Sequence, residues 1–139
     1  MRPDSRLARM SHVLIHMGLR GGSETSEVIA LMLNTNPVVV RRTMAGLRDH
    51  GYVRSERGHG GGWMLARALD EITLLDVHRA LGEPGIFAMG PSTDHPDCPV
   101  EGAVNGAVED ALRAAREVLL ARLGEVTLAD LARRVTAGE

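Results

Sequence analysis

The stretch TSEVIALMLNTNPVVVRRTMAGLRDHGYV, residues 25–53, has the pattern of two helices joined by a tight turn. Thr25 or Ser26 can cap the first helix, because a hydroxyl oxygen there accepts a hydrogen bond from an otherwise unpaired backbone amide. In the turn, Asn36 is a favourable N-cap, and Pro37 suits the first position of the second helix. The sequence therefore predicts a helix–turn–helix unit.

The second helix of this pair is expected to run to about His50, with Gly51 as its C-terminal stop. Helical periodicity divides its side chains between two faces. The inward face is predicted to hold Val40, Met44 and Leu47, and the outward face Val38, Arg41, Arg42 and Ala45. The two arginines near the helix start favour contact with DNA, and the alternative is a solvated charge pair on a surface helix.

Two short strand-like runs follow, at 52–55 and 63–66, and the glycine-rich segment RGHGGG joins them. This pattern predicts a β-hairpin. A phosphate-cradling P-loop needs a lysine, and the chain contains none. A helix–turn–helix followed by a hairpin is a winged helix, in which the second helix enters the major groove and the hairpin tip reaches the backbone or the minor groove. Glycines suit such a tip, because no Cβ holds the backbone away from the phosphates.

The flanking sequence predicts further helices. One is expected from Ser5 to about Leu19, and another from the capping-box motif at Thr73 to about Leu81. Residues 82–99 look irregular, and a long helix is expected from about Val100 to Leu123. One stripe of that helix is apolar and needs a partner, which we expect to be a second subunit: Val104, Val108, Ala111, Leu112, Ala115, Val118 and Leu119. A last short helix is predicted from Thr127 through Val135.

The net charge of −2 conceals an asymmetry along the chain. Residues 1–67 carry ten arginines against five acidic residues, whereas residues 68–139 carry six arginines against thirteen. A basic first half and an acidic second half favour a binding face and a separate body. The sequence has no apolar run long enough to cross a membrane and no signal-peptide pattern, so a cytoplasmic protein is expected.

Several segments occur in a distinctive order: SRLARMSHVLIHM, the helix–turn–helix stretch, RGHGGGWMLAR, EITLLDVHRAL and CPV. In this combination, and over nearly the whole chain, they resemble the Rrf2 family of bacterial transcription regulators. The segments NTNPVVVRR and HPDCPV are similar to the subgroup that lacks the iron–sulfur cysteines. The resemblance implies a homodimer, joined mainly through the long helix, that binds an operator with two-fold symmetry.

The resemblance also implies which residues contact DNA. The family's base-reading positions fall on Asn36, Val38 and Arg41, and its wing arginine falls on Arg57. We add Arg42 from helical geometry. The hairpin tip, with His59, Gly60 and Gly61, is expected to contact DNA as well.

The best-known Rrf2 members bind an iron–sulfur cluster through three cysteines, whereas this chain has only Cys98. We therefore expect no cluster, no other cofactor and no metal. Cys98 has three interpretations: a metal ligand together with His95, a redox-reactive thiol near a helix start, or an inert residue. His12 and His16 form an i, i+4 pair, which we expect to be structural and partly buried rather than metal-ligating.

The sequence thus predicts a mostly α-helical protein with a small β-hairpin, divided into a DNA-binding domain (1–81), an irregular loop (82–99) and a C-terminal dimerisation part (100–139). The expected function is a sequence-specific, non-catalytic DNA-binding regulator. We expect it to act as a homodimeric repressor and to respond to a redox or small-molecule signal. The effector is expected to act in the cavity between the winged helix and the dimer helix, or in the 82–99 loop. The alternative is a protein-interaction module that uses the winged helix to dock a metabolic enzyme.

Overall fold

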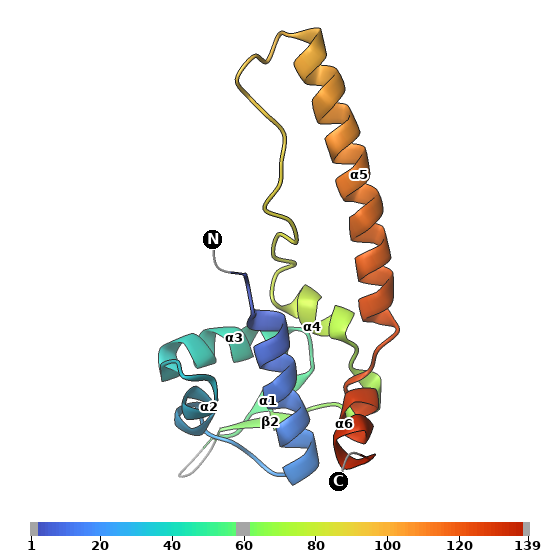
Figure 1. The fold of residues 1–139 in the computed structure, drawn as a ribbon. Helices are drawn as coiled ribbons and strands as arrows, with labels where there is room; N and C mark the ends of the chain where they lie inside the picture. The colour runs from blue at the N-terminus through green and yellow to red at the C-terminus, as the bar shows by residue number, and fades with distance from the viewer. Residues whose placement is uncertain (1–2, 58–61, 138–139) are drawn as a thin grey trace.

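The computed structural model of the protein describes residues 3–57 and 62–137 (Figure 1). Along the chain these residues form α1 (Arg6–Arg20), α2 (Ser26–Leu33), α3 (Pro37–Asp49), β1 (Val53–Ser55), β2 (Trp63–Leu65), a short 3-10 helix η1 (Leu69–Glu71), α4 (Leu74–Ala80), α5 (Pro99–Gly124) and α6 (Leu128–Ala137). The predicted fold class, mostly helical with a small hairpin, is confirmed.

The chain has two visibly different parts (Figure 1). We call α1 to α4, the hairpin and α6 the head, and α5 the spine. The spine projects away from the head, and the segment between α4 and α5 runs beside it out to its far end. Its 26 residues correspond to about 39 Å of helix.

The helix–turn–helix forms through the caps that the sequence predicts. The hydroxyl oxygen of Thr25 accepts a hydrogen bond from the backbone amide of Val28, with a distance of 3.2 Å. The side-chain oxygen of Asn36 accepts one from the amide of Val39, at 3.0 Å. Gly51 follows the end of α3 with φ of +82°, a backbone conformation that favours glycine.

Two capping boxes lie at the boundary between head and spine. Thr73 and Asp76 exchange side-chain-to-backbone hydrogen bonds of 2.9 and 3.0 Å at the start of α4, as predicted. Thr127 and Asp130 repeat this pattern at the start of α6, with both distances 3.0 Å. The two caps adjoin, because Thr73 and Thr127 form an antiparallel bridge. This bridge ties the end of the spine to the head.

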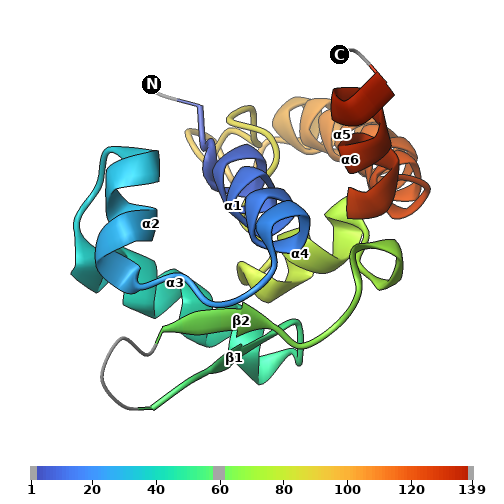
Figure 2. The same cartoon turned by 90° about the horizontal axis from the view of Figure 1, so that it is seen from below.

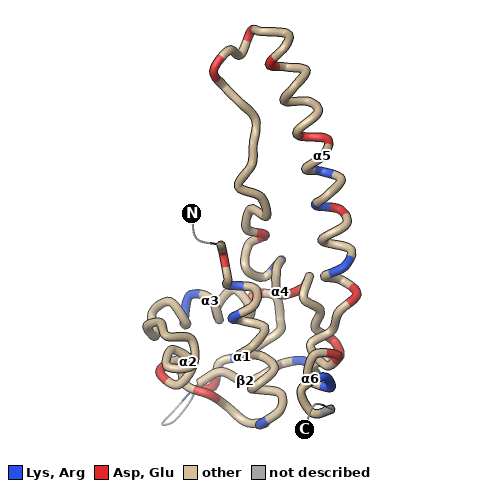
Figure 3. Tube along the Cα trace, in the orientation of Figure 1, with Lys and Arg blue, Asp and Glu red and all other residues tan. Residues whose placement is uncertain are grey.

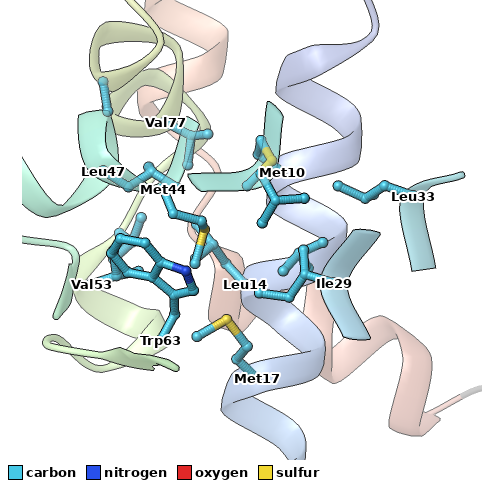
Figure 4. Packing of buried hydrophobic residues seen from close by; sticks show 14 of the residues in the cluster. Met10, Leu14, Met17, Ile29, Leu33, Met44, Leu47, Val53, Trp63 and Val77 are labelled. Atoms are coloured by element: carbon cyan, nitrogen blue, oxygen red, sulfur yellow. The ribbon is translucent and has the colours of Figure 1, made fainter. Parts of the chain in front are cut away.

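One apolar core fills the head (Figure 4). Its fully buried side chains come from α1, α2, α3, β1, α4, α6 and the turn before α4: Leu14, Ile29, Met44, Leu47, Ile72, Leu128, Val13, Val40, Val53 and Val77. The inward face predicted for α3 is confirmed, since Val40, Met44 and Leu47 are all buried. Trp63, the only tryptophan in the sequence, lies at the start of β2 and is part of this core.

The C-terminal helix belongs to this core. Figure 1 shows α6 beside α1, and the views in Figures 1 and 2 agree. Leu128 is completely buried, and its backbone amide donates to the carbonyl oxygen of Ile72 at 2.8 Å. After leaving the spine, the chain therefore returns to the head.

Candidate nucleic-acid interface

The start of α3 presents the residues expected to read DNA. Val38 is 59% exposed, and Asn36, Arg41 and Arg42 are exposed as well. Ala45, which the periodicity places on the outward face, is half-buried instead. The helix thus has a buried side and, over its first two turns, a side that carries polar, apolar and cationic groups to solvent.

Asn36 serves the fold as well as the surface. Its side-chain oxygen accepts the capping hydrogen bond from Val39, which fixes the orientation of the amide group. The amide nitrogen is the atom left for a base edge or a phosphate. Asn36 is therefore suited to hold the helix start and to donate to a ligand at the same time.

An acidic side chain that the sequence did not single out lies beside Arg41. Glu27, in the first turn of α2, places its Oε1 atom 3.8 Å from Nη1 of Arg41. Both side chains are more than half exposed, at 68% and 52%, so the attraction is screened by water. The only sequence signal for Glu27 was its place near a helix N-terminus. The contact places the Arg41 guanidinium next to the first turn of α2.

The hairpin is fastened to the helix–turn–helix by its second strand. The backbone amide and carbonyl of Trp63 pair with the carbonyl and amide of Glu24, at 2.8 and 3.0 Å. The indole nitrogen of Trp63 donates to the buried hydroxyl oxygen of Ser26 at 2.9 Å. Through Trp63, the hairpin is therefore attached both to the segment before α2 and to α2 itself.

Gly62 has an internal role that differs from the one expected for the glycine-rich segment. A Cβ added there would lie 2.3 Å from the carbonyl oxygen of Glu24, far inside contact distance. Gly62 therefore allows the wing to approach the segment before α2. Arg57 is exposed at the other end of the tip, whereas His59, Gly60 and Gly61 lie outside the described residues.

Helices α2 and α3 lie on one side of the molecule, away from α5 and α6, and strands β1 and β2 lie beside α3 (Figures 1 and 2). Figure 3 shows the charged residues along the trace, with basic positions on α3 and acidic ones toward the far end of α5. Helix α3 and the hairpin thus form a face that is separate from the spine.

The spine leaves its apolar stripe uncovered by the rest of the chain. No residue of α5 is buried. Among the predicted interface residues, Val104 is 56% exposed, Val118 62% and Leu119 36%. Ala111 and Ala115 are also exposed, while Val108 and Leu112 are half-buried. A stripe of this kind is available to a second chain.

Cys98 lies exposed at the N-cap of α5. The nearby His95 contributes backbone groups rather than its ring: its carbonyl accepts from the amide of Cys98 at 2.9 Å, and its amide donates to Glu101 at 2.6 Å. Within residues 3–57 and 62–137, no three His, Cys, Asp or Glu side chains are grouped so that they could hold a metal ion.

The rings of His12 and His16 lie next to each other on α1, with their centroids 4.7 Å apart and their planes tilted by 59°. His12 is exposed and His16 is half-buried. Burial lowers the pKa of His16, and the charges of His12 and Arg20 lower it further. Both histidines were expected to be partly buried. This is correct for His16 and wrong for His12.

The Rrf2 family model, described as an iron-dependent transcriptional regulator, matches residues 4–134. This chain belongs to the Rrf2 family. YwnA of Bacillus subtilis, named as an HTH-type transcriptional regulator, is 30% identical over 128 residues, which cover 92% of this chain and 95% of YwnA. Rrf2 regulators bind DNA, so the winged helix described above belongs to a DNA-binding family.

Solved structures of Rrf2-like proteins share the fold. A transcriptional regulator from Lactobacillus plantarum is 25% identical, covers 95% of this chain and 90% of its own, and superposes with a TM-score of 0.77. CymR, the global cysteine regulator of B. subtilis, is 27% identical with a TM-score of 0.60, and the match covers 96% of this chain and 98% of CymR. The likeness includes the spine as well as the head.

The iron named in the family description has no matching ligand set in this chain. An iron–sulfur cluster is held by several cysteine thiolates, and Cys98 is the only cysteine in the sequence. The described side chains around it do not supply a substitute set. We therefore assign no step to iron. Separately, no helix of the described ranges is long and apolar enough to cross a membrane.

Proposed function

We propose that this Rrf2 protein is a sequence-specific, cytoplasmic DNA-binding repressor that acts as a homodimer, without catalytic activity and without an iron–sulfur cluster. The observation that carries the proposal is the exposed start of α3, where Asn36, Val38 and Arg41 are all open to solvent. Helix α3 itself lies on the same side of the molecule as the hairpin. In this arrangement α3 enters the major groove, while the wing follows the adjacent backbone or minor groove.

Each reading residue has a chemistry that fits a base or a phosphate. The Arg41 guanidinium can donate two hydrogen bonds to the edge of a guanine, and Val38 offers methyl groups to the methyl of a thymine. Arg42 and Arg57 supply positive charge that holds the phosphates. Because its contact with Glu27 is exposed and screened by water, Arg41 can exchange that carboxylate for DNA at little cost.

The homodimer is supported by the exposed stripe of α5 and by the charges beside it. The first half of α5 carries Glu101, Glu109 and Asp110, and the second half carries Arg113, Arg116 and Arg122 together with Glu117. Two spines packed in opposite directions would set the acidic half of one against the basic half of the other. Such a pair separates two heads so that each reaches one half of a two-fold symmetric operator.

The alternative of a docking module for a metabolic enzyme has less support. The family and the relatives reported above are described as transcription regulators, and none of their names describes such a module. We therefore place DNA, rather than an enzyme, on the face formed by α3 and the wing.

The decisive experiment is an electrophoretic mobility shift with purified protein and the DNA upstream of its own gene. We expect a shift with a two-fold symmetric site, and an affinity that falls as salt rises, because arginine contacts release counterions from the phosphates. Absence of any shift at low salt, from protein shown by light scattering to be a dimer, would refute the proposal. A monomer at working concentration would refute the dimer.

The signal is proposed to be a redox change or a small molecule. Cys98 is exposed at the start of the spine, where a thiol is accessible to oxidants. If oxidant weakens DNA binding through this thiol, Cys98→Ser abolishes the response. A response that persists in the variant removes Cys98 from the mechanism.

A further inference from the structure

The start of α1 lies beside the start of α3. Arg6 and Arg9 of α1 line a small hollow there, together with residues of the helix–turn–helix: Leu33, Thr35, Val39, Val40 and Thr43. The floor of this hollow belongs to the core, because Met10, Leu33 and Val40 are buried. Arg6 lies at its rim, with its side chain 51% exposed. A cationic group that the sequence did not single out therefore adjoins the proposed reading helix.

Arg9 ties this part of α1 to the helix–turn–helix. Its guanidinium donates a hydrogen bond to the carbonyl oxygen of Leu33, the last residue of α2. Carbonyl groups in the last turn of a helix have no partner within that helix, so the arginine satisfies one of them. Arg6 lies one turn earlier on α1, and this contact holds its backbone close to the turn that leads into α3.

The start of α1 and the hairpin lie on opposite flanks of α3. In both views of the molecule, α3 is found between the hairpin and the N-terminal end of α1 (Figures 1 and 2). The major groove of DNA is about 12 Å wide, and an α-helix with its side chains is about 10–12 Å in diameter. When α3 fills the groove, groups on its two flanks therefore meet the two sugar–phosphate backbones.

The Arg6 guanidinium already binds an oxyanion within its own chain. Its Nε and Nη2 atoms donate to the two carboxylate oxygens of Asp4, at 2.8 to 3.2 Å. These hydrogen bonds lower the pKa of Asp4 to about 2, so the carboxylate is charged at neutral pH. Paired hydrogen bonds of this kind recognise phosphate as well as carboxylate. Both side chains are partly open to water, which screens the pair, so a phosphate can replace Asp4 at little cost.

We propose that Arg6 binds a phosphate of the DNA backbone on the side of α3 opposite the hairpin. This inference rests on the proposed function, since it concerns how α3 is held in its operator. Arg6 and Arg57 then contact the two backbones that border one major groove. The Arg6 contact carries no base information but fixes the position of α3 in the groove, and Asp4 occupies the guanidinium when DNA is absent.

The first test is the salt dependence of DNA binding, measured by fluorescence anisotropy with the full chain. Arg6→Gln removes the charge and keeps a polar side chain. For each subunit, we expect the affinity to fall about three- to tenfold and the slope of log affinity against log salt to become shallower by about one. The loss should be the same on the operator and on unrelated DNA, because a phosphate contact is independent of sequence.

Arg133→Gln is the matched control. The Arg133 side chain is also exposed, at 69%, and paired with a carboxylate, that of Asp130, but it lies on α6, away from α2 and α3. A general effect of net charge would appear in both variants. Equal affinity and equal slope for Arg6→Gln and Arg133→Gln, with thermal melts that show folded protein, would overturn the contact.

The second test locates the phosphate. One phosphate of the operator at a time is replaced by an uncharged methylphosphonate. In each half-site, one replacement should weaken binding by the wild type and have no effect on Arg6→Gln. The replacements that have no effect on Arg57→Gln should lie on the other backbone, across the same groove. If Arg6→Gln responds to every replacement as the wild type does, Arg6 binds no phosphate.

The pair with Asp4 supplies a third test. Asp4→Asn removes the carboxylate that competes for the guanidinium, so it should raise DNA affinity. It also removes one negative charge, and that general effect is measured in the Asp4→Asn/Arg6→Gln double variant. The gain should be larger with Arg6 present than with Gln in its place. Equal gains in the two backgrounds would overturn the exchange of Asp4 for a phosphate.

A free anion is the other source of the same chemistry, and inorganic phosphate is the probe for it. Saturable calorimetric binding of inorganic phosphate that Arg6→Gln abolishes, together with unchanged DNA affinity in that variant, would assign Arg6 to a free anion and overturn the proposal. A wild type that binds no DNA contradicts the proposed function and this inference together. A wild type that binds its operator, with Arg6→Gln no weaker than Arg133→Gln, contradicts this inference alone.

Discussion

Helices α1 and α5 are both amphipathic, yet the chain covers only one of them. The 15 residues of α1 include five that are buried, whereas none of the 26 residues of α5 is buried. The head contains α1 within a closed core, and α6 returns from the spine to complete it. The difference shows that the core of the head is completed within one chain, whereas the apolar stripe of the spine is left exposed by it.

The largest effect is expected from a charge on the spine. Val118→Glu places a carboxylate in the predicted interface, and burying it unpaired costs several kcal/mol, so DNA affinity should fall roughly 100-fold or more. The thermal melt of the head should change little, because Val118 is 62% exposed within its own chain.

Gly106→Glu is the matched control for this change, because it adds the same charge on the same helix roughly opposite the stripe, where a Cβ meets no atom within 4 Å. Light scattering should report a monomer for Val118→Glu and a dimer for the control. A dimer in both variants would show that the stripe is not the interface.

Arg41→Ala tests the head without touching its core. Loss of a guanidinium from a base edge should cost about 1–3 kcal/mol of discrimination at one base pair per half-site. Competition with singly substituted operators measures this preference. Arg48→Ala, in the last turn of the same helix, is the control and should leave the preference intact. If Arg41→Ala keeps the wild-type base preference, Arg41 does not read that base pair.

Gly62→Ala tests the attachment of the wing. The added Cβ would lie 2.3 Å from the carbonyl oxygen of Glu24, so the backbone must shift, at a cost of about 1–3 kcal/mol of unfolding free energy. Urea denaturation followed by tryptophan fluorescence is a direct measure, because Trp63 is the neighbouring residue. A Gly85→Ala control meets no atom within 4 Å and should be near neutral. An unchanged midpoint for Gly62→Ala would contradict this close approach.

Arg57→Ala should weaken binding to all sequences, or to A·T-rich flanks if the side chain enters the minor groove. For a lost phosphate contact, the slope of log affinity against log salt should become shallower by about one. Anisotropy titrations at several salt concentrations report both quantities. Unchanged affinity and slope would refute the wing assignment.

The smallest effect is expected at a helix cap. Thr73→Ala removes the hydroxyl that accepts from the amide of Asp76 and should destabilise the protein by about 1 kcal/mol. Thr43→Ala is the control, since that hydroxyl only donates to a carbonyl of its own helix. Calorimetric melts compare the two. Equal melting temperatures would mean that the cap adds nothing to the junction.

The local structure could be predicted well from the sequence because its signals are local. Asn36 and Pro37 identify the start of α3, and the spacing of Val40, Met44 and Leu47 identifies its buried face. The capping box at Thr73 is equally readable. Each of these features depends on residues within a turn or two of one another.

Contacts between distant segments could not be predicted in this way. Nothing near Leu128 in the sequence indicates that it packs into a core built mainly from residues before position 81. Gly62 looked like part of a tip that faces DNA, and its close approach to Glu24 appears only when the wing is folded onto the chain before α2. Arg41 and Glu27 meet because two helices cross, which helical spacing alone does not determine. The DNA contacts and the dimer stripe remain predictions.

The number of residues in α5 has a consequence of its own, since the helix is held at both ends. Asn105 exchanges hydrogen bonds of 2.8 and 2.9 Å with Ser92 near one end, and the bridge between Thr73 and Thr127 fastens the other. One inserted residue would turn the far end by about 100° relative to the head, whereas seven would return it to within about 20°. A change in the length of α5 would therefore keep its far end facing the same way only if it added or removed whole turns.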